Sequence, residues 1–348
     1  MSPMPTLLDA FRAQRRIHPM VRRTPLEADL ALAERTGAAG VHLKLECRQP
    51  TDAFKVRGAA NKILGLDAEA RRRGVMANKI LGLDAEARRR GVITFSTGNH
   101  GKAVAYVARQ AGIPATVCLS EHVPAYRAEA IRRLGAQVVV KGRSQDEAES
   151  HYRELMETQG LIPVVPFDDP CVIAGQGTVA LEILDRLPDT DVLLVPLSGG
   201  GLLAGMAMVA KSINPSIQVI GLSLERSPAM LESLKAGKPV TVKERDTVAD
   251  SLLGGIGVDN RYTLPMVANY VDAHLLIDEE EIKAGMYYLF ETHRLIAEGA
   301  AAVGVGALLS GRIDAAGKQV ATVVTGGSVE SAAYLAVIRE RLERKTDP

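Results

Sequence analysis

Short apolar runs rich in β-branched residues alternate along the chain with stretches whose apolar positions recur at helical spacing. The apolar runs, which predict strands, are residues 41–46, 92–95, 115–119, 137–140, 192–195, 218–222 and 320–324. The amphipathic stretches, which predict helices, include residues 7–17, 30–36, 103–111, 125–134 and 145–158. Most of the strands show little polar alternation, which is typical of parallel sheets that helices cover on both faces. The pattern therefore predicts an α/β protein.

A single lysine stands in the segment TDAFKVRGA, residues 51–59. Pro50 restricts the residue before it to extended conformations, so we expect a helix to begin two or three residues before Lys55. A lysine partly desolvated beside Phe54 and near Arg57 would have a lowered pKa and would serve as an amine nucleophile. The alternative is an ordinary solvated surface charge.

Sixteen residues, ANKILGLDAEARRRGV, occur twice without a change, at 60–75 and again at 77–92. A single perfect copy differs from a solenoid, whose repeats come in threes or more. An offset of 17 residues is about 4.7 helical turns, so a continuous helix would turn the second copy to another face. We therefore expect one copy to pack as the local helix and the other to loop out. A regulatory insertion is the alternative.

Composition is that of an ordinary globular protein, since 47% of the 348 residues are hydrophobic and 24% are charged. A formal net charge of +1 gives no reason to expect nucleic acid as a partner. The cysteines Cys47, Cys118 and Cys171 show no paired spacing and suit a reducing compartment. The sequence has neither an apolar run of 18 residues nor an amino-terminal segment of signal-peptide type. We expect a cytoplasmic protein that uses no membrane.

Three glycine-rich loops follow predicted strands. The first, STGNHG at residues 96–101, precedes a helix, where an anion such as a carboxylate binds well. The second, SGGGLLAG at residues 198–205, opens a helix with three consecutive glycines, and a phosphate cradle is the economical explanation. The third, TGGS at residues 325–328, places a hydroxyl at the carboxyl end of a strand. Together with a reactive lysine, these loops suit a phosphorylated aldehyde cofactor.

Six motifs, in this order, resemble those of the fold-type II pyridoxal-phosphate enzymes, the threonine dehydratase and serine racemase family. They are KLE at 44–46, FKVRGA at 54–59, GNHG at 98–101, AGQGT at 174–178, GGGL at 199–202 and TGG at 325–327. The resemblance implies pyridoxal 5'-phosphate as the cofactor. It also implies an α/β fold with two open, twisted, mostly parallel sheets flanked by helices, as in the tryptophan synthase β-subunit. Residues 166–170, 249–257 and 298–300 resemble the hydroxyectoine-utilisation dehydratase branch.

The resemblance assigns the cofactor to the lysine segment and to all three loops. Lys55 would bind the cofactor aldehyde as a Schiff base and then move a proton at the substrate Cα, while Phe54 would pack on the ring. Asn99 would hydrogen-bond the 3-hydroxyl, and Thr325 would meet the pyridine nitrogen. A neutral partner there makes the ring a weaker electron sink, which suits elimination over transamination. The phosphate would lie on the backbone of Gly199, Gly200, Gly201 and Leu202.

By the same resemblance, the substrate carboxylate would be held by Ser96, Thr97, Asn99 and His100. Thr97 also stands where serine racemases have a serine as second catalytic base, and its extra methyl speaks against efficient racemisation. His100 equally suits a histidine fixed by its helix in the core or at the surface. The family's divalent-cation site has a glutamate where this chain has Ser223, although Glu225 is near. The sequence leaves a divalent cation undetermined.

We expect a lyase that removes water from a β-hydroxy amino acid, after which the enamine product hydrolyses to a 2-oxo acid and ammonia. The branch resemblance points to hydroxyectoine catabolism. The enzyme alternatives are an L-threonine or L-serine dehydratase, a serine racemase and a hydroxyaspartate ammonia-lyase. The non-enzyme alternative is a relative inactivated by the duplication.

The family pattern predicts a large cofactor-binding domain, residues 1–90 and 169–348, and a small mobile domain, residues 91–168. The small domain would close over the substrate and exclude water. The duplicated segment, residues 60–92, would fall at the seam between the two domains. A homodimer that acts on a small-molecule amino acid is expected from the resemblance.

Overall fold

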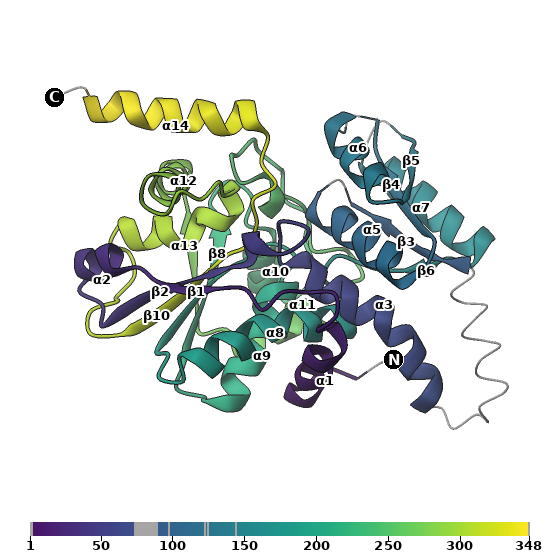
Figure 1. Ribbon diagram of the computed structural model, residues 1–348, viewed down its shortest axis with the longest axis horizontal. Helices are drawn as coiled ribbons and strands as arrows, with labels where there is room; N and C mark the ends of the chain where they lie inside the picture. Colours follow the sequence, from purple (N-terminus) through teal and green to yellow (C-terminus); the bar gives the residue numbers. More distant parts are fainter. Residues whose placement is uncertain are drawn as a thin grey trace.

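The computed structural model describes residues 3–72, 90–96, 98–121, 123, 125–142 and 145–346. Two separate sheets organise these residues (Figure 1). The larger sheet has the order β1 (Leu26–Ala28), β2 (Gly40–Leu45), β10 (Gln319–Val324), β7 (Val192–Pro196), β8 (Gln218–Leu224) and β9 (Ala273–Ile277). All its neighbours are parallel except β1 with β2. The smaller sheet is wholly parallel, with the order β5 (Gln137–Val140), β4 (Ala115–Leu119), β3 (Val92–Phe95) and β6 (Ile162–Pro163).

Helices cover both faces of the larger sheet, which is why its strands are apolar on both sides. One face packs against α1 (Leu7–Ile17), α8 (Pro170–Arg186), α9 (Gly201–Ile213), α10 (Ala229–Ala236) and α11 (Thr263–Tyr270). The other face packs against α2 (Leu30–Thr36), α12 (Glu279–His293) and α13 (Gly299–Leu309). The last helix, α14 (Ser331–Thr346), lies along the outside of α12 (Figure 1).

The smaller sheet has helices of its own. One face packs against α3 (Lys55–Arg72), α5 (Asn99–Ala111) and α6 (Ala125–Arg133), and the other against α7 (Gln145–Gln159). Because α3 contacts both α5 and α8, it joins the two sheets. Two short 3-10 helices, η1 (Glu46–Arg48) and η2 (Asp250–Leu252), complete the described elements. The expected fold class, two mostly parallel sheets flanked by helices, is confirmed.

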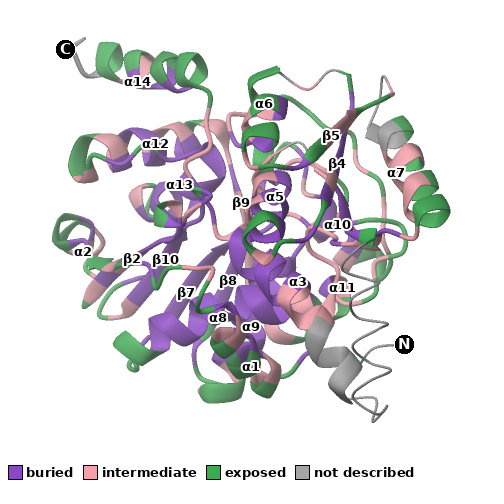
Figure 2. Cartoon of the chain, turned by 45° about the vertical axis from the view of Figure 1, so that its right-hand side comes forward, coloured by how far each residue is buried: buried purple, intermediate pink, exposed green. Residues whose placement is uncertain are grey.

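Burial follows this layering. Figure 2 shows the central strands and most of α8 and α9 buried, whereas the outer faces of α2, α7 and α14 are exposed. No helix in the described ranges combines the length and apolar character needed to cross a membrane.

All seven predicted strands are present, but the sequence pattern did not indicate β9, β6 or β1 as strands. β9 lies at the edge of its sheet, and four of its five residues are only half-buried, so it lacks the apolar run of the central strands. Residues 60–72 of the first repeat copy belong to α3. Residues 77–89 of the other copy, on which the predicted looping-out falls, lie outside the described part of the chain, whereas its last residue, Val92, begins β3.

Glycines fix α3 against the large sheet's helices. A Cβ on Gly175 of α8 would come within 2.7 Å of the Arg57 carbonyl oxygen and 2.8 Å of the Gly58 Cα. A Cβ on Gly58 would in turn meet the Gln176 amide at 2.4 Å. The backbones of α3 and α8 therefore approach closely only because both positions are glycine, and this crossing fixes the start of α3.

Candidate active site

The lysine segment is held by the third glycine-rich loop. The Phe54 amide donates to the Thr325 carbonyl at 3.0 Å, and the Gly327 amide donates to the Asp52 carbonyl at 2.9 Å. Asp52 itself has a left-handed conformation, with φ of 57°. These bonds use backbone groups that a helix would need, so α3 begins at Lys55 and not two or three residues earlier as predicted. Lys55 is nevertheless in the first turn.

The Lys55 side chain is half-buried at the start of α3. Its Nζ donates a 2.8 Å hydrogen bond to the Pro166 carbonyl and lies 5.1 Å from the centroid of the Phe54 ring. Burial lowers the pKa of Lys55 to about 8, although the charge of Glu298 opposes this shift. The predicted partial desolvation and lowered pKa agree with this environment, and a fraction of the amine is neutral near physiological pH. The role of Lys55 as the nucleophile stays a prediction. Arg57, which the sequence also suggested as a cause, is not responsible for the shift.

The Arg57 side chain instead points into a buried charge network below the lysine. Its guanidinium bonds Glu46 and Glu182, each at 2.7 Å, and Lys44 Nζ bonds Glu182 at 2.6 Å. Burial alone would raise the pKa of Glu46, but Arg57 overcomes this and the pKa is lowered. Two cations and two carboxylates thus neutralise one another, as buried charges require. The network ties the first turn of α3 to β2 and α8.

His100 is a core residue, 2% exposed, at the start of α5. Its Nε2 lies 2.8 Å from the Val164 carbonyl oxygen, and because a carbonyl can only accept, Nε2 carries the proton. Its Nδ1 is a buried acceptor that has no hydrogen-bond partner in the described residues. Burial and the nearby charge of Lys55 lower the pKa of His100 to about 3. The imidazole is therefore neutral, and the surface interpretation of His100 is wrong.

Asn99 connects the smaller sheet's side of the site to the larger sheet's side. Its Nδ2 donates to both carboxylate oxygens of Glu298, at 2.9 and 3.0 Å. Its Oδ1 is buried and finds no partner among the residues the structure describes. The Ser251 hydroxyl also donates to Glu298, at 3.2 Å.

Glu298 is a site residue that the sequence analysis did not assign. It is 5% exposed, and burial raises the pKa of its carboxyl group while the Asn99 hydrogen bond opposes that rise. Residues 298–300 were noticed only as a branch motif. The signal that could have identified Glu298 is an acidic residue directly before GAAAVGVGALL, a helix that is otherwise apolar.

The glycines at 199–201 have packing reasons as well as a potential ligand-binding role. Gly200 has φ of +86°, and a Cβ on Gly199 would lie 2.4 Å from the Phe167 ring. A phosphate cradle is therefore not the only economical explanation for three glycines. The loop still leads directly into α9, whose first amides have no partner within the helix. Such an amino terminus favours a bound phosphate.

The remaining predicted site residues differ in how far they are buried. Ser96 is half-buried and accepts a long, 3.5 Å hydrogen bond from the Gly98 amide. Thr325 is 3% exposed and Leu202 is 5% exposed. Thr97 lies outside the described residues.

Lys102 further joins the first and third loops, because its Nζ bonds Ser328 at 3.0 Å and Asp52 at 3.2 Å. The first and third glycine-rich loops and the lysine segment are therefore brought together by direct contacts.

These residues fit a phosphorylated aldehyde cofactor. The chemistry that such a group needs is supplied by the Lys55 amine, by the glycine loop at a helix start, and by buried acceptors on Asn99 and His100 that have no partner among the described residues. For a divalent cation, no group of three or more His, Cys, Asp or Glu side chains comes together within the described ranges.

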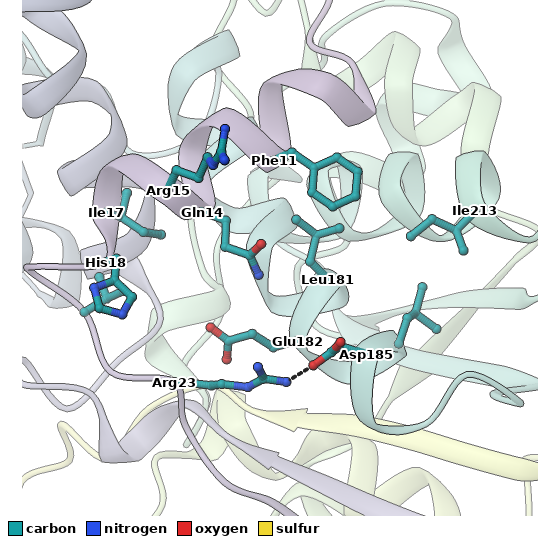
Figure 3. Close-up of a pocket in the computed structure, with 12 residues that line it drawn as sticks. Phe11, Gln14, Arg15, Ile17, His18, Arg23, Leu181, Glu182, Asp185 and Ile213 are labelled. Atoms are coloured by element: carbon teal, nitrogen blue, oxygen red, sulfur yellow. Dashed lines mark hydrogen bonds and ion pairs between the residues drawn. The ribbon is translucent and has the colours of Figure 1, made fainter.

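A separate groove of about 760 Å³ lies between α1 and α8 (Figure 3). Its lining includes Phe11, Gln14, Leu181 and Glu182, and none of the predicted cofactor or substrate residues. Both Glu182 oxygens already accept bonds from Arg57 or Lys44. The groove is thus distinct from the site around Lys55.

Comparison with known proteins agrees with this geometry. Residues 17–326 match a family model described as "Pyridoxal-phosphate dependent enzyme". A Sinorhizobium fredii protein named "Putative threonine dehydratase" is 44% identical over 94% of this chain and 93% of its own. The L-threonine ammonia-lyase of Thermotoga maritima is 40% identical over 94% of this chain and 76% of its own. The structure of maize serine racemase superposes with a TM-score of 0.85 at 31% identity, covering 99% of each chain.

Proposed function

The chain belongs to the family of pyridoxal-phosphate dependent enzymes, and we propose that it converts a β-hydroxy amino acid to a 2-oxo acid and ammonia. It is a pyridoxal-phosphate-dependent lyase with threonine dehydratase-like β-elimination chemistry. The observation that carries the residue assignment is the half-buried Lys55, whose lowered pKa of about 8 gives its amine a larger neutral fraction near pH 7 than an ordinary lysine has.

Lys55 is proposed to hold the cofactor and to act as the base. Bound pyridoxal phosphate withdraws electrons from the substrate Cα and so makes its proton acidic. Lys55 Nζ would take that proton and return a proton to the departing β-hydroxyl, which would leave as water. The enamine product would then hydrolyse to a 2-oxo acid and ammonia. The low pKa of Lys55 suits this role, because a base should be neutral near the working pH.

The other residues are proposed to bind and orient. Phe54 would pack on the cofactor ring, and Thr325 would meet the ring nitrogen. Asn99 would bond the 3-hydroxyl, which its partnerless Oδ1 supports. The phosphate would lie on the amides of Gly199, Gly200, Gly201 and Leu202.

Recognition of the substrate carboxylate is proposed for Ser96, Thr97, Asn99 and His100. Asn99 Oδ1 and His100 Nδ1 can only accept, so these two residues would donate through their backbone amides. The start of α5 supports this assignment, because it offers unpaired backbone amides and the positive end of the helix dipole. Thr97 is also the proposed second catalytic group.

L-Threonine and L-serine are the first substrates to test, since two similar proteins carry the names threonine dehydratase and L-threonine ammonia-lyase. Ammonia release should be measured with the cofactor-loaded enzyme and a panel of β-hydroxy amino acids, with 2-oxobutyrate and pyruvate identified as products. Absence of ammonia from every member of the panel would contradict the proposal.

A hydroxyectoine-derived hydroxy amino acid is the second candidate. The segments that resemble that branch lie at the site: Pro166 accepts from Lys55, and Ser251 donates to Glu298. They are therefore positioned to affect which substrate side chain fits. Greater kcat/KM with a hydroxyectoine derivative than with L-threonine would favour this candidate.

Chiral analysis of the products separates the racemase and hydroxyaspartate alternatives. D-Serine formed from L-serine would indicate racemase activity, and oxaloacetate formed from 3-hydroxyaspartate would indicate the ammonia-lyase. Failure of the protein to bind the cofactor in a titration would favour an inactive relative.

We propose that residues 91–168 form the mobile unit and that residues 1–90 and 169–348 form the cofactor-binding unit. The separate smaller sheet, which lies within residues 92–163, supports this division. Small-angle scattering should show compaction when a substrate analogue binds.

We further propose a cytoplasmic homodimer. The cysteines Cys47, Cys118 and Cys171, which show no paired spacing, support a reducing compartment. Exposed Leu8 and Phe11 on α1 and Ile213 at the end of α9 support an apolar contact surface. Light scattering should give the mass of a dimer, and Phe11→Glu should shift it toward a monomer if this surface forms the contact.

A further inference from the structure

We propose that Glu298 is a positioning residue whose carboxylate fixes the orientation of the Asn99 amide and controls how readily the Lys55 amine reacts. The inference rests on the proposed role of Lys55 as the cofactor-binding amine.

The backbone around Glu298 directs its side chain into the site. Glu298 is the N-cap residue of α13, yet its carboxylate accepts no capping bond from that helix. Its amide donates to the Gly326 carbonyl at 3.1 Å, which holds it beside the loop that also pairs with Phe54. A Cβ on Gly326 would lie 2.7 Å from Glu298 Oε1, so the glycine makes room for the carboxylate.

The hydrogen bonds of Glu298 determine which way the Asn99 amide faces. Asn99 Nδ2 lies within hydrogen-bond distance of both Glu298 oxygens, a geometry in which the NH₂ group donates to an ionised carboxylate. The partnerless carbonyl Oδ1 is therefore the atom left for a ligand. Without the Glu298 carboxylate, no acceptor would hold the Asn99 NH₂ group in place, and the NH₂ group and Oδ1 could exchange positions.

Glu298 is a buried carboxylate that forms no salt bridge with any residue in the described ranges. A buried charge without a paired cation is unfavourable unless it has a compensating interaction. Its compensation comes from three neutral donors, the Asn99 amide, the Ser251 hydroxyl and the Ser328 backbone amide, and from the electrostatic attraction of Lys55. The same attraction raises the pKa of Lys55, whereas burial lowers that pKa.

Labelling of Lys55 in the full-length protein tests the proposal directly. Cofactor is first removed with hydroxylamine, and rebinding is used to verify that the site is intact. Acetylation of Lys55 by limiting acetic anhydride is then followed by mass spectrometry across a pH series, with Lys235 as the internal standard. We expect Glu298→Gln to increase Lys55 acetylation at pH 7 by about 3- to 10-fold, because one unit of pKa changes the neutral fraction about tenfold.

Ser251→Ala is the matched control, because it removes a hydrogen bond from Glu298 but keeps the charge. Ser251→Ala should leave Lys55 acetylation within about twofold of wild type at each pH. Glu298→Asp retains the charge, so its Lys55 acetylation should stay closer to wild type than that of Glu298→Gln. Circular dichroism verifies folding of each variant. Identical Lys55 profiles for wild type and Glu298→Gln would overturn the proposal.

A second readout uses the cofactor-loaded protein. The pH midpoint of the visible absorbance of bound cofactor should fall in Glu298→Gln, because loss of an anion destabilises a nearby protonated nitrogen. An unchanged midpoint would overturn the electrostatic role. The labelling result does not depend on turnover. An absence of ammonia release would therefore refute the proposed function, whereas the role of Glu298 would still be tested by Lys55 labelling.

Discussion

The Nζ of Lys55 donates a 2.8 Å hydrogen bond to the backbone carbonyl of Pro166, a residue 111 positions later in the sequence. Pro166 lies between β6 of the smaller sheet and α8 of the larger one. Its neighbour Phe167 packs against Gly199 and Gly201. The chain between the two sheets therefore connects the candidate amine with the candidate phosphate loop.

Replacement of Lys55 by alanine should abolish the visible absorbance of covalently bound cofactor. The proposed covalent link needs an amine at the start of α3, and Lys55 supplies it there. Absorbance of the purified protein after addition of pyridoxal phosphate and gel filtration provides the measurement. Lys235→Ala, at an exposed position paired with Glu232, should keep the absorbance. Retention of the absorbance in Lys55→Ala would contradict the assignment of the cofactor lysine.

Rebinding of the cofactor to the resolved protein should accelerate as pH rises. Only the neutral amine attacks an aldehyde, and the pKa of Lys55 is about 8. Below that pH the rate constant should increase about tenfold per pH unit, and above it the rate should level off. Stopped-flow absorbance at several pH values measures this. A rate that is flat from pH 6 to 9 would be incompatible with such an amine.

The sequence pattern predicted the central strands and several helices because their burial is repeated along contiguous residues. It also predicted Lys55 in a first helical turn. The pattern could not reveal Glu298 opposite Asn99, because these residues are 199 positions apart and meet only through the fold. The start of α3 was predicted too early for the same reason. The bonds that hold residues 52–54 come from the loop at residues 325–327.

The second glycine-rich loop shows how one pattern can have two physical causes. Sequence alone connected its three glycines with phosphate. The structure adds the positive φ of Gly200 and the close approach of Phe167 to Gly199. A glycine required by packing and a glycine required by a ligand look the same in a sequence.

Gly175→Ala should destabilise the fold at the crossing of α3 and α8. The new Cβ would meet the Arg57 carbonyl at 2.7 Å, and backbone atoms cannot move aside as a flexible side chain can. We expect a loss of about 1–3 kcal/mol in the free energy of unfolding, measured by urea denaturation. Gly255→Ala is the control, because its Cβ would meet only one atom, at 3.9 Å. Equal stability of the two variants would show that the crossing tolerates a Cβ.

Arg57→Leu should be more damaging, because it leaves Glu46 and Glu182 buried with Lys44 as the remaining cation of the network. Removal of one partner from a buried ion pair destabilises a protein by about 3–5 kcal/mol. The loss should appear in urea denaturation at pH 7. Arg23→Ala removes an exposed pair with Asp185 and should leave the free energy of unfolding close to that of wild type, because solvent screens such a pair. Similar losses in both variants would argue against a stabilising role for the network.

His100 should make the protein less stable in acid. Burial lowers its pKa to about 3 in the folded protein, whereas an unfolded histidine has a pKa of about 6.5. Between these values the unfolded chain binds one proton more at this position. The free energy of unfolding should therefore fall as pH decreases, by about 1.4 kcal/mol per pH unit from this group alone.

His100→Gln tests this directly, since an amide donor can still reach the Val164 carbonyl but cannot take up the proton. The variant is expected to be less stable than wild type at pH 7.5 because a buried ring is lost. Its free energy of unfolding should nevertheless fall less steeply between pH 6 and 4, by a difference of about one proton in the linkage slope. Urea denaturation at each pH gives both slopes. Equal slopes would show that His100 is not the group that takes up this proton on unfolding. The folded imidazole would then already be protonated in this pH range, and a positively charged His100 would face the substrate carboxylate.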